Sequence, residues 1–79
     1  MNEQPIVWEV RKRASLFTPS RFSVYVVPNS KGLVALLARI FDADTLLTIM
    51  ERAAHVSLWA ERQATHIREA LTGFETADC

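Results

Sequence analysis

Apolar and polar residues alternate in two short segments near the start of the chain. Residues 6–13 and 21–27 both have a period of two, and their apolar positions are Ile6, Trp8, Val10, Phe22, Val24 and Val26. This period, combined with aromatic and β-branched residues, predicts two strands. Pro19 and the neighbouring hydroxyl residues form a short connection with turn chemistry, which favours an antiparallel hairpin.

Residues 31–41 form the next apolar segment, and their spacing predicts a helix. Pro28 ends the second strand, and either Asn29 or Ser30 is suited to cap the helix that follows. Apolar residues surround most of this helix, namely Leu33, Val34, Leu36, Leu37, Ile40 and Phe41. Because a helix that is apolar on most sides needs burial on most sides, we expect it to be central.

A heptad pattern runs through the rest of the chain. Residues 45–72 contain neither Gly nor Pro, with Asp44 as the expected N-cap and Gly73 as the expected C-cap. Steps of four and three residues define a seam: Leu46, Met50, Ala53, Ser57, Ala60, Ala64, Ile67, Leu71 and Phe74. A helix of about 28 residues is long for this chain, and helix propensity falls at residues 55–57, where a break would come.

These patterns predict an α+β fold in which an antiparallel β-hairpin precedes two helices, the second of them long. With 79 residues, the chain has room for one domain, spanning residues 1–79. The predicted core consists of Trp8, Phe22, Val24, Leu36, Leu37, Ile40, Leu46 and Met50.

Self-association is expected because the chain is small and apolar. Hydrophobic residues make up 49% of it, and a single Cys excludes a disulfide framework. Off the seam, the long helix carries a second apolar set: Leu47, Ile49, Val56, Leu58 and Trp59. We therefore predict a homodimer whose interface contains Met50, Ser57, Ala60, Ala64, Ile67 and Leu71. The alternative is a monomer that folds all of this surface inward.

The formal net charge of zero combines two unlike halves. Residues 1–40 contain six basic and two acidic residues, whereas residues 41–79 contain three basic and seven acidic ones. Such a dipolar chain can be steered toward a charged partner by either half. The alternative is that both halves are ordinary solvated surface.

The basic half places its charges on the hairpin. If Trp8 and Val10 face the core, alternation points the side chains of flanking residues outward. We predict a partner-binding set of Arg11, Lys12, Arg13, Arg21 and Tyr25, with Lys12 near the turn. Arg and Tyr are typical of protein hot spots, and on a ribbon they also suit phosphate contact and base stacking. A third interpretation is a solvated polar face.

No combination of residues in the sequence indicates catalysis. Carboxylates accompany His55 and His66 at helical spacing, but no nucleophile elbow or glycine-rich phosphate loop goes with them. We therefore expect a protein that is not an enzyme and has no cofactor and no metal. Without a long apolar run or a signal-peptide pattern at residues 1–5, we also expect no membrane contact and a cytoplasmic location.

The chain is a short single domain with charged faces and no catalytic motif. In these general features it resembles the small inhibitor proteins of phages and mobile elements, such as anti-CRISPR proteins. That resemblance implies a protein that binds a host defence complex, such as a CRISPR effector, and blocks its recognition of target DNA. No site residue is carried over from it.

A second resemblance concerns the strand at residues 21–27, with outward Arg21, Ser23 and Tyr25 followed by helices. It is similar to a ribbon-helix-helix repressor, which implies a dimer that places this strand in the major groove of DNA. The sequence departs from that pattern in three ways. The strand at residues 6–13 competes for the same pairing, the long second helix exceeds the usual size in that family, and the charge balance is less basic.

Overall fold

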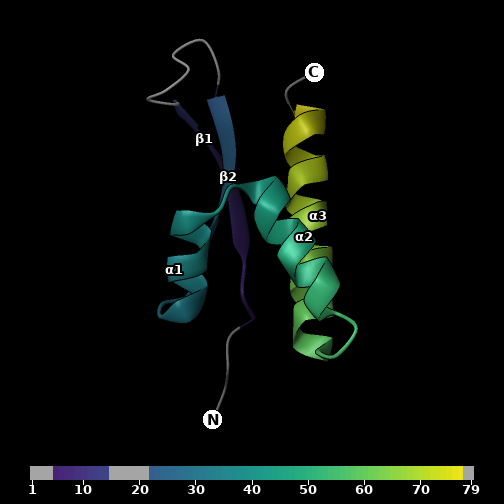
Figure 1. Cartoon of the computed structure of the whole chain (residues 1–79). Coiled ribbons are helices and arrows are strands. Elements are labelled where there is room, and N and C mark those ends of the chain that lie inside the picture. Colours follow the sequence, from purple (N-terminus) through teal and green to yellow (C-terminus); the bar gives the residue numbers. More distant parts are fainter. Residues whose placement is uncertain (1–4, 15–21, 78–79) are drawn as a thin grey trace.

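The computed structural model describes residues 5–14 and 22–77, with the backbone alone at residues 13, 14, 22, 23 and 77. Its elements follow one another as β1 Trp8–Ala14, β2 Phe22–Pro28, α1 Leu33–Ile40, α2 Ala43–Ala53 and α3 Leu58–Ala77 (Figure 1). The predicted α+β class, with a hairpin before the helices, is confirmed. The expected long second helix is instead two helices, α2 and α3.

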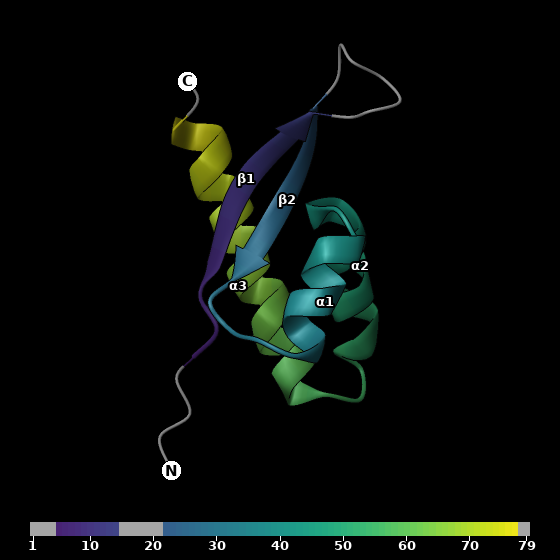
Figure 2. The ribbon, with the colours of Figure 1, turned by 90° about the vertical axis from the view of Figure 1, so that its left-hand side faces the viewer.

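The two strands form an antiparallel hairpin whose register pairs Trp8 with Pro28 and Lys12 with Val24. Helix α1 lies on one side of this hairpin, and α2 and α3 lie on the other (Figures 1 and 2). Asn29 continues the pairing beyond β2. Its side-chain Oδ1 accepts from the Val7 amide at 3.0 Å, and its own amide donates to the Val7 carbonyl at 3.1 Å. Asn29 therefore secures the start of β1 rather than capping α1.

Helix α1 begins without a side-chain cap, contrary to the expectation for Asn29 or Ser30. Its N-cap residue is Gly32, whose φ of 80° lies in a region that favours glycine. The Ser30 hydroxyl is buried and has no hydrogen-bond partner among the described residues. The connection from β2 therefore reverses through glycine geometry and not through a capping side chain.

The second half of the chain turns back on itself at residues 54–57, where the sequence predicted a break. Asp42, rather than the expected Asp44, caps α2 by accepting from the Thr45 amide at 2.9 Å. Ser57 caps α3, because its hydroxyl accepts from the Ala60 amide at 3.2 Å. Gly73 lies within α3 and does not end it.

Helix α2 packs along α3, and the heptad seam lies mostly between these helices and the hairpin. The buried hydrophobic residues are Trp8, Val26, Ala38, Ala43, Leu46, Met50, Ala60, Ala64 and Ile67. Gln63 is the buried polar residue of the described chain, and its Oε1 accepts from the Trp8 indole Nε1 at 3.0 Å. This bond joins β1 to α3 inside the core.

The predicted core is partly correct. Burial of Trp8, Leu46 and Met50 is confirmed, whereas the Val24 and Leu37 side chains are half-buried. The prediction is wrong for Leu36 and Ile40, which are exposed because α1 presents its opposite side to the hairpin. The Phe22 side chain is outside the described part of the structure.

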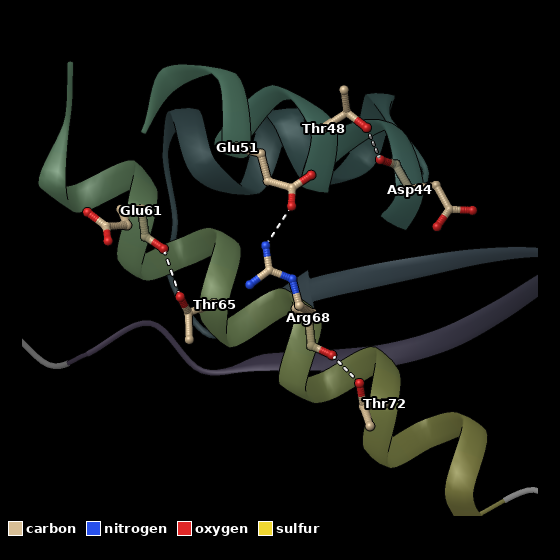
Figure 3. A network of polar contacts seen from close by, with 7 residues as sticks. All are labelled: Asp44, Thr48, Glu51, Glu61, Thr65, Arg68 and Thr72. Atoms are coloured by element: carbon tan, nitrogen blue, oxygen red, sulfur yellow. Dashed lines mark hydrogen bonds and ion pairs between the residues drawn. The ribbon is translucent and has the colours of Figure 1, made fainter. Parts of the chain in front are cut away.

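A polar surface covers the outer side of the α2–α3 pair (Figure 3). The Arg68 guanidinium on α3 donates to the Glu51 carboxylate on α2 at 2.5 Å. Three hydroxyls each donate a hydrogen bond to a carbonyl one turn earlier in the same helix, those of Thr48, Thr65 and Thr72. The Arg68 and Glu51 side chains are about half exposed, so their ion pair adds little to a pair of helices already held by the seam.

Candidate protein-interaction surface

The register of the hairpin divides the predicted basic set between two faces. Arg11 lies directly opposite Tyr25, so these residues share a face, as predicted. Lys12 points the other way, and its Nζ lies 5.3 Å from the centre of the Phe74 ring on α3. The ammonium group of Lys12 thus contacts the protein's own aromatic ring, on the face opposite Arg11.

The other two basic residues of the predicted set, Arg13 and Arg21, lie partly or wholly outside the described part of the structure. The Arg13 backbone pairs with Ser23, which places it in the same row as Arg11. Its side chain is outside the described part of the structure, and so is the whole of Arg21. Arg11 and Tyr25 are therefore the predicted binding residues that the structure brings together.

A pocket of about 250 Å³ lies between this hairpin face and α1. Its lining residues are Arg11, Tyr25, Val26, Val27, Pro28, Ala35, Ala38 and Arg39. Val26 and Ala38 are buried core residues. Arg11 and Arg39 also line this pocket, one from a strand and one from a helix.

The two arginines differ in their partners. Arg11 pairs with Glu9 on its own strand, with Nη2 and Oε2 3.3 Å apart, but both side chains are mostly exposed. Such a surface pair is weak and readily rearranged. No carboxylate in the described part of the chain pairs with Arg39. The pocket therefore keeps an uncompensated positive charge from α1.

Helix α1 also presents an apolar stripe to solvent. Leu33, Leu36 and Ile40 are 70%, 50% and 60% exposed, whereas Ala38 is the residue of α1 that is buried. Their spacing of three and four residues places them on one side of the helix. The expectation of a central helix is thus wrong, because α1 packs through Val34, Leu37, Ala38 and Phe41.

The pocket and the stripe join through Arg39. This residue lines the pocket and lies one helical turn after Leu36, next to the stripe. We call the combined area the α1 docking surface, and it consists of Arg11, Tyr25, Leu33, Leu36, Arg39 and Ile40. The sequence does not single out Arg39, because a lone Arg on an apolar helix carries no signal until the hairpin is placed beside it.

A second apolar area lies at the reversal between α2 and α3. Val56, Leu58 and Trp59 are all exposed there, with Val56 at 90%. These residues belong to the second apolar set of the sequence. The other two members, Ile49 and Leu47, are half-buried on α2.

The predicted dimer interface is largely interior. Met50, Ala60, Ala64 and Ile67 are buried within the single chain, and Leu71 is half-buried. Ser57 is occupied in capping α3. In this structure the seam is filled by α2 folding onto α3, so most of the predicted interface set is not exposed at the surface of the single chain. Homodimer formation stays a prediction.

The histidines do not share a helix face. His55 lies in the turn after α2, whereas His66 lies on α3 beside Glu69 in an open pocket next to Trp8. The Glu51 carboxylate, expected near His55, is bound by Arg68 instead. Within residues 5–14 and 22–77, no group of three or more acidic, His or Cys residues is placed to hold a metal ion.

Comparisons with known proteins found no relative of this chain. A scan against protein-family models, a search of curated proteins and a search of solved structures each returned no match. Among the helices in the described part of the chain, none has the length and apolar character needed to cross a membrane.

Proposed function

We propose that this protein is a non-enzymatic, cytoplasmic interaction module that binds a host protein complex through the α1 docking surface. One observation carries the proposal: α1 buries Ala38 while exposing Leu33, Leu36 and Ile40. Burying one such side chain is worth about 1.5–3 kcal/mol. A partner that covered all three would gain much of the apolar energy that folding leaves unused.

The surroundings of the stripe match the anatomy of a protein interface. Protein hot spots combine well-packed apolar anchors with Arg and Tyr. Here the stripe supplies the anchors, and Arg39 connects it to the pocket that Arg11 and Tyr25 also line. Contiguous apolar patches rimmed by polar residues are a feature of docking sites on small proteins. These features support protein binding over a solvated polar face.

The nature of the host complex follows from the resemblance to phage-type inhibitors. We propose a CRISPR effector as the complex, with inhibition by blocking its recognition of target DNA. A 79-residue chain acts in this way by occupying a surface, for which it needs a docking area and no catalytic group.

The test uses purified CRISPR effector complexes loaded with guide RNA and a labelled target duplex. We expect the protein to bind one class of effector and to reduce its DNA binding. Leu36→Asp should weaken the interaction by at least about 100-fold, the size of a hot-spot loss. Thr65→Asp, on the exposed outer side of α3, is the matched control and should bind as the wild type does.

Two outcomes would overturn parts of the proposal. Equal binding by wild type and Leu36→Asp would remove the α1 docking surface as the site. No binding to any effector would remove the CRISPR assignment. Capture from host lysate that is lost in Leu36→Asp and kept in Thr65→Asp would then retain the interaction module with another partner.

The nucleic-acid alternative has its own measurement. Fluorescence anisotropy with a labelled random-sequence duplex at about 50 mM and about 200 mM salt separates phosphate binding from protein binding, because phosphate contacts weaken steeply over that range. We expect no binding at either concentration. β2 already pairs with β1 of its own chain. The edge of β2 that faces β1 is therefore not available to form a ribbon with a second copy.

A further inference from the structure

We infer that the pocket between the hairpin and α1 receives the carboxylate of an acidic side chain from a partner protein, while apolar side chains of the same partner cover the stripe. This inference rests on the proposed function and specifies the chemistry of the partner. It begins from the size of the pocket. At about 250 Å³ it is smaller than the cavities that hold drug-sized ligands, and it fits a single side chain.

The positive charge of the pocket favours an acidic side chain as its ligand. Arg guanidinium groups bind carboxylates through paired, charge-assisted hydrogen bonds. Arg39 has no acidic partner in the described residues, and the exposed Glu9–Arg11 pair can open at low cost. An incoming carboxylate would therefore compensate Arg39 and share Arg11 with Glu9.

The neighbouring stripe favours a protein over a nucleic acid as the source of the acid. Protein–nucleic acid interfaces are polar and strongly positive. The stripe of Leu33, Leu36 and Ile40 lies on the same helix as the pocket residue Arg39, and a sugar–phosphate backbone would leave it uncovered. A protein segment can deliver one carboxylate and several apolar side chains together.

Charge also argues against a second copy of α1 as the occupant. Helix α1 and the residue before Gly32 carry Lys31 and Arg39, with no acidic residue between them. A twofold pairing along the stripe would bring these like charges together while leaving both pockets without an acid. The partner is therefore a different, acidic and apolar surface.

The first test examines the pocket without the partner. The probe is 4-methylpentanoate, a carboxylate with a branched apolar tail, compared with its neutral amide and with inorganic phosphate in nitrogen-15 NMR titrations. We expect saturable shifts of the Arg11 and Arg39 Nε–H signals with the carboxylate alone. Equal shifts with the amide, or stronger binding of phosphate, would overturn the inference, and the phosphate result would favour nucleic acid.

The second test measures binding to the full partner complex, which is the complex whose binding is lost in Leu36→Asp and kept in Thr65→Asp. Arg39→Gln should weaken partner binding by at least about tenfold, the effect of losing one charge-assisted hydrogen bond, and Arg39→Lys should weaken it less. The control is Arg52→Gln, an exposed Arg in the last turn of α2. Circular dichroism verifies the fold of each variant.

The two proposals fail in distinguishable ways. If Leu36→Asp abolishes partner binding and Arg39→Gln does not, the interaction module stands and the acidic pocket is overturned. If neither variant affects binding, the α1 docking surface itself is wrong.

Discussion

Helix α1 and the α2–α3 pair are both rich in apolar residues, yet they use them in opposite ways. The pair buries Leu46, Met50 and Ile67 between its helices and the hairpin, although Leu58 and Trp59 at the start of α3 stay exposed. Helix α1 turns Ala38 inward and leaves Leu36 and Ile40 in solvent. The pair also has side-chain caps at the start of each helix, whereas α1 begins at a glycine.

This difference teaches that apolar content does not decide which residues form the core. Helix α1 is apolar around most of its circumference, so two of its sides could have faced the hairpin. The side that does so contains Ala38, which lets the helix approach the sheet closely. The same side also carries Val34, Leu37 and Phe41, which pack against the core. The opposite side leaves Leu33, Leu36 and Ile40 exposed to solvent.

The largest expected effect comes from placing one charge in each region. Met50→Asp should lower the free energy of unfolding by about 3 kcal/mol or more, because it buries an unpaired carboxylate, and this is a large part of the about 4–12 kcal/mol expected for a chain of this size. Leu36→Asp should change the melting temperature by no more than about 4 °C. Circular dichroism melts measure both. A larger loss for Leu36→Asp than for Met50→Asp would reverse the comparison.

The next effect concerns the buried bond between the hairpin and the α2–α3 pair. Gln63→Ala removes the acceptor of the Trp8 indole and leaves that donor buried, which should lower the free energy of unfolding by about 1–3 kcal/mol. Arg62→Ala, its exposed neighbour on α3, should change it by no more than about 0.5 kcal/mol. Urea denaturation distinguishes them, and equal values would remove the bond from the core.

The smallest effect separates the caps of the two regions. Asp42→Ala should cost about 1 kcal/mol, because the Thr45 amide loses its acceptor. Ser30→Ala, before α1, should leave stability unchanged or raise it slightly, since its buried hydroxyl has no partner among the described residues. Asp44→Ala is the control for α2, with a loss of a few tenths of a kcal/mol. Thermal melts compare the three variants.

Local patterns in the sequence predicted much of the fold. The period of two located both strands and the shared face of Arg11 and Tyr25. The dip in helix propensity located the turn at residues 54–57, and the heptad seam identified Leu46 and Ile67 as packing positions. Each of these features depends on neighbours a few residues apart, which is why the sequence alone reveals them.

Tertiary contacts decided the rest. The heptad seam is equally consistent with a dimer interface and with two helices folded back on each other, because both arrangements bury Met50 and Ala60. Periodicity cannot predict which side of α1 meets the hairpin, because the helix is apolar around most of its circumference. Arg39 became a site residue only through that orientation, when the helix brought it beside Arg11.

The two tryptophans lie in contrasting environments, and this gives the protein two built-in optical reporters. Trp8 is 6% exposed in the core, where its indole is bound to Gln63, so its emission should be blue-shifted and should redden on unfolding. Trp59 is 46% exposed at the start of α3, so it should emit as a solvated indole in the folded protein and should be open to collisional quenchers. In single-tryptophan variants, Trp8 would therefore follow folding, while Trp59 would sense whatever approaches the α2–α3 reversal.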